Sequence, residues 1–555
     1  MLICGVKISH DAGIAAIDGE KLLFSTELEK LNNNSRYSSL DKVEQIAEIL
    51  KTENIGISDV DRFVIDGWWS EPGASSTFVH STIRDRPVNI QVAPYIDEGT
   101  ARPCTARYSF ANLDLGLGEA HYSSYHHATG HLFGCYCSSP FARRGEDALI
   151  LVWDGGMTPR LYEVNATKRS AHLVQPLTLI MGNTFADFAR YFEPFCADSS
   201  GWDDDRDLRY HLSIAGKAMA YAALGTVQQD LFGYFDDFLD GLTNISAENA
   251  ALLARQVIAD RNGRFKGLSN ADIITTLQAY LGNSLLEALK TIVARRYGSE
   301  ARNLGIAGGC ALNIKWNSLL RESGLFREVW VPPFPNDSGA AIGAAAAEMF
   351  IFGRLPAIDW NVYSGPRLMS TTAGNQWVVR PCTERQVAEI LYREGEPVVV
   401  LSDRAELGPR ALGNRSILAP TAEAKMKSHL NDIKGREGYR PIAPICIESR
   451  ASEIFDPGTP DPYMLFEHKV RPLWTRAIPA VVHLDGTARL QTIRTDTSVT
   501  GRILDEYARL SGIPVLCNTS ANFSGKGFFP DIASASRWGE TKYIWSDGKL
   551  FVKKT

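Results

Sequence analysis

The sequence predicts an α/β protein of more than one domain, and three observations support this. Glycine and aspartate turns separate short apolar runs typical of strands, at residues 2–7, 14–17 and 22–24. A second β-rich stretch of the same kind covers residues 147–164, with a turn at Gly155 and Gly156. Residues 212–297 are rich in Ala and Leu at helical spacing, most clearly over 278–296. Strand, D-x-G turn and strand therefore occur twice, which suggests duplicated α/β halves around a cleft.

Length and composition indicate a globular protein. The chain has 555 residues, of which 45% are hydrophobic and 22% are charged. At roughly 150 residues per domain, this length corresponds to two to four domains. The nine cysteines are scattered without a C-x-x-C pair, and neither a signal peptide nor a membrane span is recognisable. We therefore expect a reduced, cytoplasmic protein without membrane association.

The overall charge argues against a nucleic-acid partner. The formal net charge is −6 and the isoelectric point is about 6.1. A protein that holds a long polyanion usually presents a basic face. Local basic clusters could still bind a small phosphorylated ligand.

A change of pattern predicts the domain boundary. Pro, Gly, Ser, Thr and Asn dominate residues 355–377, after which a helix at 384–394 and a strand at 397–401 begin a new domain. We expect one domain at residues 1–360 and a second at 375–555.

Four residues form a candidate metal site. His127 and His131 are four residues apart, so on a helix both imidazoles project from one face. Asp154 ends a buried strand, and Asp337 precedes a glycine-rich helix. Strand ends that meet at one cleft would bring these side chains to a shared ion. The alternative is that both aspartates cap turns and helices.

Glycines and arginines form two candidate anion sites. Gly308 and Gly309 stand at a strand-to-helix turn whose amides could approach a phosphate, although neither a Walker nor a Rossmann motif is present. The alternative is that this glycine pair, taken alone, forms a tight packing turn. Arg410 lies in a Gly/Pro turn among apolar residues, where an unpaired charge would be costly. The other members of this basic cluster are Arg404, Arg415, Lys434, Arg436, Arg440 and Arg489. We favour anion binding over solvated surface charge for this cluster.

Five motifs carry a family resemblance over nearly the whole chain. They are GPRALGNRSIL, the HHxxxH helix, the D-G-G turn, the AGG-x-ALN turn and the N-D-x-G-A-A-x-G-A-A run. With these motifs in this order, the sequence resembles the carbamoyltransferase family, which includes NodU-like, cephem and tobramycin O-carbamoyltransferases. The resemblance implies a TsaD-like first domain of the actin-like ATPase superfamily, with duplicated α/β halves, and a smaller YrdC-like α/β second domain.

The resemblance also implies an activity. The second domain would form carbamoyladenylate from carbamoyl phosphate and ATP, with Mg²⁺ accompanying the ATP. The first domain would transfer the carbamoyl group to a hydroxyl of a small-molecule natural product of the antibiotic type. Iron(II) or another divalent ion would be the metal, and a homodimer is one assembly state that the sequence allows. The alternatives are a tRNA threonylcarbamoyl transferase and a non-enzymatic, actin-like ATP-binding regulator.

Each implied role falls on a numbered residue. The metal ligands would be His127, His131, Asp154 and Asp337. Catalytic residues would be His10, Asp11, Arg410, Lys434 and Arg440. Substrate or ATP would bind at Lys217, Gly308, Gly309, Asn313, Arg489, Asn518 and Ser520.

Two assignments stay open in the sequence. The basic E-R-F-x-R-x-K segment of such families is replaced by residues 27–36, where Lys30 or Arg36 could supply the positive charge. The general base for the acceptor hydroxyl could be His10 or one of the aspartates at positions 203–205.

Overall fold

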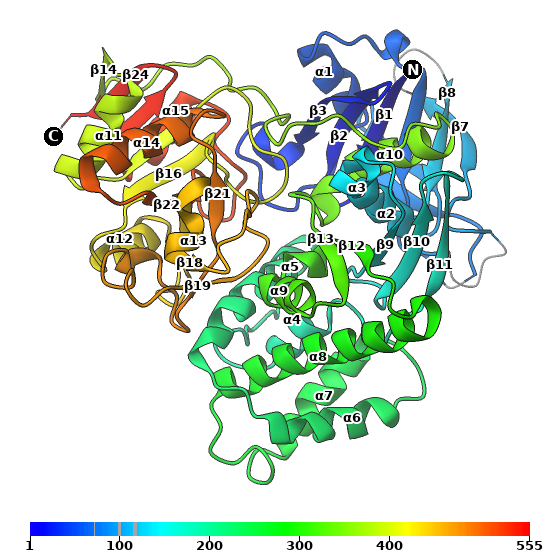
Figure 1. The fold of residues 1–555 in the computed structure, drawn as a ribbon. Helices are drawn as coiled ribbons and strands as arrows, with labels where there is room; N and C mark the ends of the chain where they lie inside the picture. Colours follow the sequence, from blue (N-terminus) through cyan, green and yellow to red (C-terminus); the bar gives the residue numbers. More distant parts are fainter. Residues whose placement is uncertain (72, 98–101, 115–118, 555) are drawn as a thin grey trace. The chain divides into compact units, whose positions relative to one another are not determined.

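The computed structural model describes residues 1–71, 73–97, 102–114 and 119–554 and has the mixed α/β fold that the sequence predicts. The chain divides into two compact units, and Figure 1 labels many of their helices and strands. The first unit contains Met1–Leu23 and Ser39–Trp360, and the second contains Phe24–Ser38 and Asn361–Thr555. The second unit thus takes in a segment that the sequence places in the first domain.

Two sheets of related topology form the centre of the first unit. Across the first sheet the strands are β3 (Lys21–Glu27), β2 (Gly13–Asp18), β1 (Leu2–Lys7), β4 (Arg62–Asp66), β8 (Glu119–Tyr125) and β7 (Tyr108–Asp114). Across the second they are β11 (Ser170–Pro176), β10 (Arg160–Asn165), β9 (Ala148–Val152), β12 (Arg302–Ala307) and β13 (Phe326–Trp330). In each, the first strand in sequence pairs antiparallel with the second and parallel with a later one. This shared order confirms the predicted duplication.

Two helices pack closely in this unit. Helix α2 (His127–Ser138) is wholly buried, and α10 (Ala340–Ile351) consists largely of alanine. A Cβ on Gly343 of α10 would lie 2.1 Å from the carbonyl oxygen of Gly130 on α2. The absence of a side chain at Gly343 therefore allows backbone-to-backbone approach. That approach brings the start of α2 near the turn that precedes α10.

Further helices cover the rest of the first unit. They are α1 (Glu44–Thr52), α3 (Pro140–Arg143), α4 (Thr184–Ala189), α5 (Asp204–Tyr221), α6 (Phe232–Asp240), α7 (Glu248–Ala259), α8 (Asn270–Tyr297) and α9 (Ile314–Glu322). Helix α8 starts earlier than the predicted 278–296, because Ser269 and Asp272 form a capping box at its N-terminus. A hairpin of β5 (Thr77–Ile83) and β6 (Arg86–Val92) completes the unit. Within the described ranges, no helix has both the length and the apolar character that crossing a bilayer requires.

One large sheet with apolar layers on both faces forms the second unit. Its strands are β14 (Trp377–Pro381), β24 (Lys549–Lys553), β23 (Tyr543–Ser546), β15 (Val398–Leu401), β16 (Arg415–Pro420), β22 (Val515–Ser520), β17 (Ala443–Ile447) and β21 (Gln491–Ile493). Along β15, Val399 and Leu401 belong to one buried cluster, and Val398 and Val400 belong to another. This alternation buries the sheet on both sides.

Helices supply the covering layers of that sheet. Helices α11 (Glu384–Arg393) and α14 (Val499–Ser511) pack on the face of Val398, and α11 corresponds to the helix predicted at 384–394. The other face is covered by α12 (Lys425–Ile433), α13 (Ala451–Ile454) and α15 (Ile532–Trp538). The strands β18 (Phe455–Asp456), β19 (His468–Val470) and β20 (Thr487–Ala488) form a separate small sheet in this unit.

Candidate metal centre and anion site

The four predicted metal ligands lie together in the first unit. His127 and His131 come from α2, Asp154 follows β9, and Asp337 begins the turn before α10. One potential ligand atom from each of the four residues lies within 4.8 Å of the others, and all four are buried. The Nε2 atoms of His127 and His131 are 3.0 Å apart, and Asp337 Oδ1 lies 3.3 and 3.4 Å from them. The close approach of α2 and α10 produces this arrangement.

The donor set fits a divalent transition metal. Two imidazole nitrogens and two carboxylate oxygens are ligands typical of iron, manganese and zinc sites. Burial opposes the charged form of Asp337, but Lys7, His127 and His10 hold its pKa well below the usual range. Burial and the Asp337 charge also oppose ionisation of Asp154, and His127 and His131 outweigh them, so that its pKa is lowered. Both carboxylates are therefore ionised, as metal ligation requires.

Outer partners orient these ligands, and sequence reasoning missed them. Asp66 Oδ2 lies 2.7 Å from His127 Nδ1, which leaves Nε2 facing the other ligands. Lys7 Nζ lies 2.9 Å from Asp66 Oδ2 and 3.0 Å from Asp337 Oδ2. The Tyr95 hydroxyl donates to Asp154 Oδ2 at 2.6 Å, and its ring stacks on His127. The signal in the sequence is a charged residue at the end of each of two apolar strands, β1 and β4.

The predicted catalytic pair His10 and Asp11 lies beside the same cluster. His10 Nδ1 is 3.1 Å from Asp11 Oδ2 and 3.7 Å from Asp337 Oδ2. Burial lowers the pKa of His10, but the hydrogen bond with Asp11 and the Asp337 charge outweigh it and raise the pKa above the ordinary value. The imidazole also packs edge-on against Trp68. His10 is thus positioned to contact a group bound at the cluster.

The predicted glycine turn borders the cluster and helps to build it. Gly308 has a φ of +90°, and a Cβ there would lie 2.3 Å from the Trp153 carbonyl oxygen. The amide of Gly309 donates to Asp154 Oδ1 at 2.6 Å. Asn313 caps α9 through its side-chain oxygen. A nucleotide-binding role for these residues stays a prediction. So does that of Lys217, which lies on α5 with its ammonium 5.9 Å from the ring centre of Tyr210.

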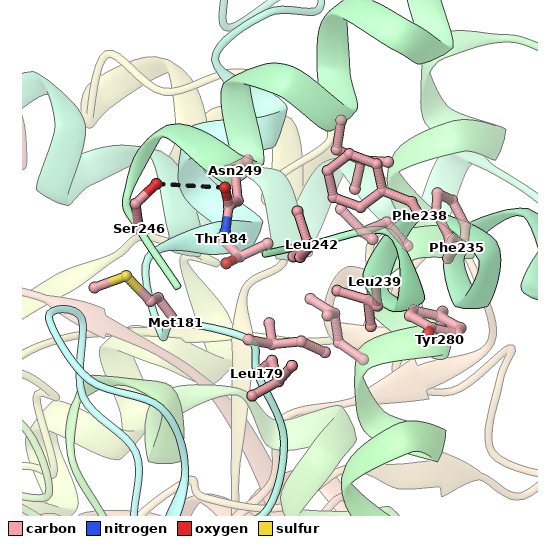
Figure 2. Close-up of a pocket in the computed structure, with 15 residues that line it drawn as sticks. Leu179, Met181, Thr184, Phe235, Phe238, Leu239, Leu242, Ser246, Asn249 and Tyr280 are labelled. Atoms are coloured by element: carbon pink, nitrogen blue, oxygen red, sulfur yellow. Dashed lines mark hydrogen bonds between the residues drawn. The ribbon is translucent and has the colours of Figure 1, made fainter. Parts of the chain in front are cut away.

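An apolar pocket lies among the helices of the first unit. Apolar side chains line most of it, among them leucines and phenylalanines of α6, α7 and α8, and its polar groups belong to Thr184, Ser246, Asn249 and Tyr280 (Figure 2). The segment 179–184 lines the pocket with Leu179 and Met181. The same segment adjoins the cluster, since a Cβ on Gly182 would lie 2.2 Å from the Asp154 carbonyl oxygen. Its lining suits an apolar group rather than a phosphate.

Six basic side chains influence one another in the second unit. They are Arg36, Arg410, Lys434, Arg436, Arg440 and Arg489. Burial and the neighbouring charges lower the pKa of Arg436 to about 9. The same two causes, burial first, hold the pKa of Lys434 and of Arg489 well below their ordinary values. A buried group of like charges is what an anion would neutralise.

The cluster residues differ in how many partners they already have. Lys434 Nζ donates to Ser520 O, Asn522 O and Asn522 Oδ1 at 2.6–2.8 Å, so all three of its protons are engaged. Arg436 donates to Ser520 Oγ at 3.2 Å. Among the residues that the structure describes, Arg489 has no hydrogen bond or salt bridge, and its Nε is buried. Arg489 is therefore the clearest candidate to contact an anion directly.

Ser520 contacts the cationic cluster through Arg436, whereas Asn518 contacts other residues. Its side-chain amide donates to Ala411 O at 3.0 Å and to Gln491 Oε1 at 2.7 Å. The first contact attaches β22 to the turn that carries Arg410, and the second attaches it to β21. The structure thus gives Asn518 a bracing contact, and its predicted role in substrate binding stays a prediction.

The structure separates the two candidates in the N-terminal basic segment. Lys30 is buried and donates to Glu27 Oε1, Glu406 O and Gly408 O at 2.6–2.7 Å. Arg36 instead donates its backbone amide to Gly525 O at 3.0 Å, and its charge contributes to lowering the pKa of Arg410, Lys434, Arg436 and Arg440. Lys30 supports the loop, and Arg36 contributes charge to the cluster.

The GPRALGNRS turn is held from both sides. Glu406 Oε1 accepts the amides of Leu412, Asn414 and Arg415 at 2.7–3.1 Å. The guanidinium of Arg415 donates to backbone carbonyls of residues 402, 403 and 414. Arg415 is therefore structural. Burial, opposed by Asp461 and reinforced by Arg36, lowers the pKa of Arg410 to about 10.

Comparison with known proteins supports the family resemblance that the sequence motifs indicate, and it does so over nearly the whole chain. The family models for the carbamoyltransferase N-terminus and C-terminus match residues 2–346 and 388–544. Nodulation protein U of Sinorhizobium fredii is 44% identical over 568 residues, covering 100% of this chain and 99% of that protein. The 3'-hydroxymethylcephem-O-carbamoyltransferase of Streptomyces clavuligerus is 32% identical over 554 residues, covering 98% of this chain and 97% of that protein.

Likeness to solved structures is weaker. Full-length HypF aligns with 62% of this chain and 55% of its own, at 13% identity and a TM-score of 0.31. Since both family models match in order and a relative of 44% identity spans the chain, this protein is an enzyme of the carbamoyltransferase family.

Proposed function

We propose that the protein is an ATP-dependent O-carbamoyltransferase that uses carbamoyl phosphate and acts on a hydroxyl of a small molecule. The observation that carries the donor half is the buried cationic cluster of the second unit, in which Arg489 has no hydrogen bond or salt bridge among the described residues. The hydroxyl acceptor is supported by the named activity of the Streptomyces clavuligerus relative. We assign the first unit to the actin-like class and the second to the YrdC-like class as part of this proposal.

The first half-reaction is assigned to the second unit. Water cleaves carbamoyl phosphate to carbamate and inorganic phosphate, and a carbamate oxygen then attacks the α-phosphorus of ATP. The bond to the β-phosphate oxygen breaks, and carbamoyladenylate and pyrophosphate form. Arg410 and Arg489 would bind phosphate oxygens through their guanidinium groups, which suit bidentate contacts. Lys434 supplies charge rather than a hydrogen bond, because its protons are engaged by Ser520 and Asn522.

The second half-reaction is assigned to the first unit. His127, His131, Asp154 and Asp337 would hold the divalent ion, with iron as the proposed metal. When bound, this ion supplies Lewis-acid chemistry that makes AMP a better leaving group. The acceptor hydroxyl oxygen attacks the carbamoyl carbon, the bond to the AMP oxygen breaks, and the hydroxyl proton is lost. His10 lies 3.7 Å from Asp337 and would receive that proton.

The two halves can be tested separately. In the presence of ATP and Mg²⁺, the purified protein should release pyrophosphate when carbamoyl phosphate is added and should release none without it. Arg410→Ala should abolish this release, whereas Arg494→Ala, a change at an exposed arginine paired with Asp496, should not. His127→Ala should keep pyrophosphate release and lose transfer. Transfer is read as a mass gain of roughly 43 Da on a hydroxylated acceptor. Unchanged release by Arg410→Ala would remove the assignment of the second unit.

A further inference from the structure

The candidate metal centre contains a buried ammonium group that metal ligation does not require. Lys7 ends β1, and its side chain is 1% exposed. Its Nζ lies 2.9 Å from Asp66 Oδ2 and 3.0 Å from Asp337 Oδ2. The indole of Trp68 closes one side, with its ring centre 4.6 Å from Nζ. Lys7 is therefore fixed beside a ligand carboxylate and does not extend to solvent.

Asp66 connects this ammonium group to the other side of the centre. Its Oδ2 contacts both Lys7 Nζ and His127 Nδ1, while its Oδ1 is buried without a hydrogen bond among the described residues. The register of the sheet explains the pairing, because β1 and β4 are parallel and Val6 lies opposite Ile65. The residues after Val6 and Ile65 therefore meet at the same edge of the sheet.

The charges of these groups add to a definite value. With neutral imidazoles, the ligands Asp154 and Asp337 and the outer carboxylate Asp66 contribute three negative charges. Lys7 contributes one positive charge, so the groups within hydrogen-bonding distance of the centre carry a net charge of −2. That value balances a divalent ion. Without Lys7 the three carboxylates would carry a net charge of −3, which favours a trivalent ion.

We propose that Lys7 and Asp66 together set the charge of the metal centre, so that the first unit holds a divalent ion in preference to a trivalent one. Asp66 orients His127, and Lys7 offsets the charge that Asp66 introduces. This inference rests on the metal site of the proposed function and assigns it a charge preference. Lys7 and Asp66 are positioning residues, because both act through ligands and not on the substrate.

The size of the effect follows from Coulomb's law. A unit charge about 5 Å from the ion, at an effective dielectric constant of about 20, changes the ratio of trivalent to divalent affinity by about two orders of magnitude. For iron this ratio is measured by the reduction potential of the bound ion. A 100-fold change in the ratio corresponds to about 120 mV for a one-electron couple.

The test uses the full-length protein, stripped with a chelator and loaded anaerobically with iron(II). Metal content is measured by elemental analysis, and the reduction potential is measured by spectroelectrochemical titration. Lys7→Met should lower the potential by about 120 mV, and Asp66→Asn should raise it by a similar amount. The double variant restores the net charge and should return close to the unaltered protein. Lys21→Met, which removes a charge at an exposed lysine of β3, is the control and should leave the potential unchanged.

The outcomes separate this inference from the proposed function. If the unaltered protein binds no stoichiometric iron, the metal site of the proposed function is wrong. If it binds iron but the two single variants have unchanged potentials, or the double variant does not compensate, the charge-setting role is overturned. Should Lys7→Met fail to fold, the shift in Asp66→Asn decides the matter alone.

Discussion

The contact between Gly130 and Gly343 provides a quantitative test of how the fold builds the metal centre. A Cβ on Gly343 would lie 2.1 Å from Gly130 O, whereas real Cβ atoms do not approach another heavy atom below 3.0 Å. Gly343→Ala must therefore move α10 away from α2 by about 1 Å, and overpacking of this kind costs about 1–3 kcal/mol.

The same displacement should weaken metal binding, because α2 carries His127 and His131 while Asp337 precedes α10. Metal–ligand distances tolerate only about 0.2 Å of change. We expect Gly343→Ala to lose at least tenfold in affinity for the divalent ion. Chemical denaturation measures the cost in stability, and equilibrium dialysis measures the affinity.

A matched control keeps the two effects of alanine apart. Gly233 lies on α6, and a Cβ there would meet nothing within 4 Å. Gly233→Ala should leave metal affinity unchanged and alter the free energy of unfolding by less than about 1 kcal/mol. If Gly343→Ala matches this control in both measurements, close helix packing does not position the ligands.

Two further predictions concern the cationic cluster. Arg489→Ala should weaken the binding of inorganic phosphate about tenfold or more, as measured by isothermal titration calorimetry, and should not destabilise the unliganded protein, since removing a charge relieves repulsion. The control Arg494→Ala should change neither phosphate affinity nor stability. Equal phosphate binding by the two variants would contradict the assignment. Burial, followed by the charges of neighbouring arginines, lowers the pKa of Lys434 below the ordinary value of 10.5. The unfolded chain therefore keeps the Lys434 proton up to a higher pH than the folded protein does. The free energy of unfolding should rise with pH between the lowered pKa and 10.5. Phosphate favours the ammonium form, so its binding in that window should take up a proton, seen as a dependence of the heat on buffer ionisation that Lys434→Met removes.

Local patterns and strand ends could be interpreted from the sequence. The spacing of His127 and His131 fixes their common helix face, and Asp154 follows a recognisable apolar strand. The repeated D-x-G turns also indicated the duplicated halves, although not the order of the strands within each sheet. These inferences succeed because each depends on residues that are near one another in the chain.

The contacts that the sequence did not predict join distant residues. Lys7 and Asp66 are 59 positions apart and meet only because β1 and β4 pair in parallel. Lys30 reaches carbonyl oxygens 376 and 378 positions away, which explains why segment 24–38 belongs to the second unit. Single-sequence periodicity gives the existence of a strand but not its partner. A charged residue in an apolar strand is the signal that such a partner exists.

The two candidate sites carry charges of opposite sign. The metal site of the first unit brings carboxylates together with the ammonium group of Lys7, which brings their net charge to the value that balances a divalent ion. The second unit concentrates buried cations in which Arg489 has no hydrogen bond or salt bridge within the described ranges. Each cluster costs free energy when empty, because like charges are buried together. Binding of an ion of opposite charge should therefore stabilise each unit, in addition to serving the reaction.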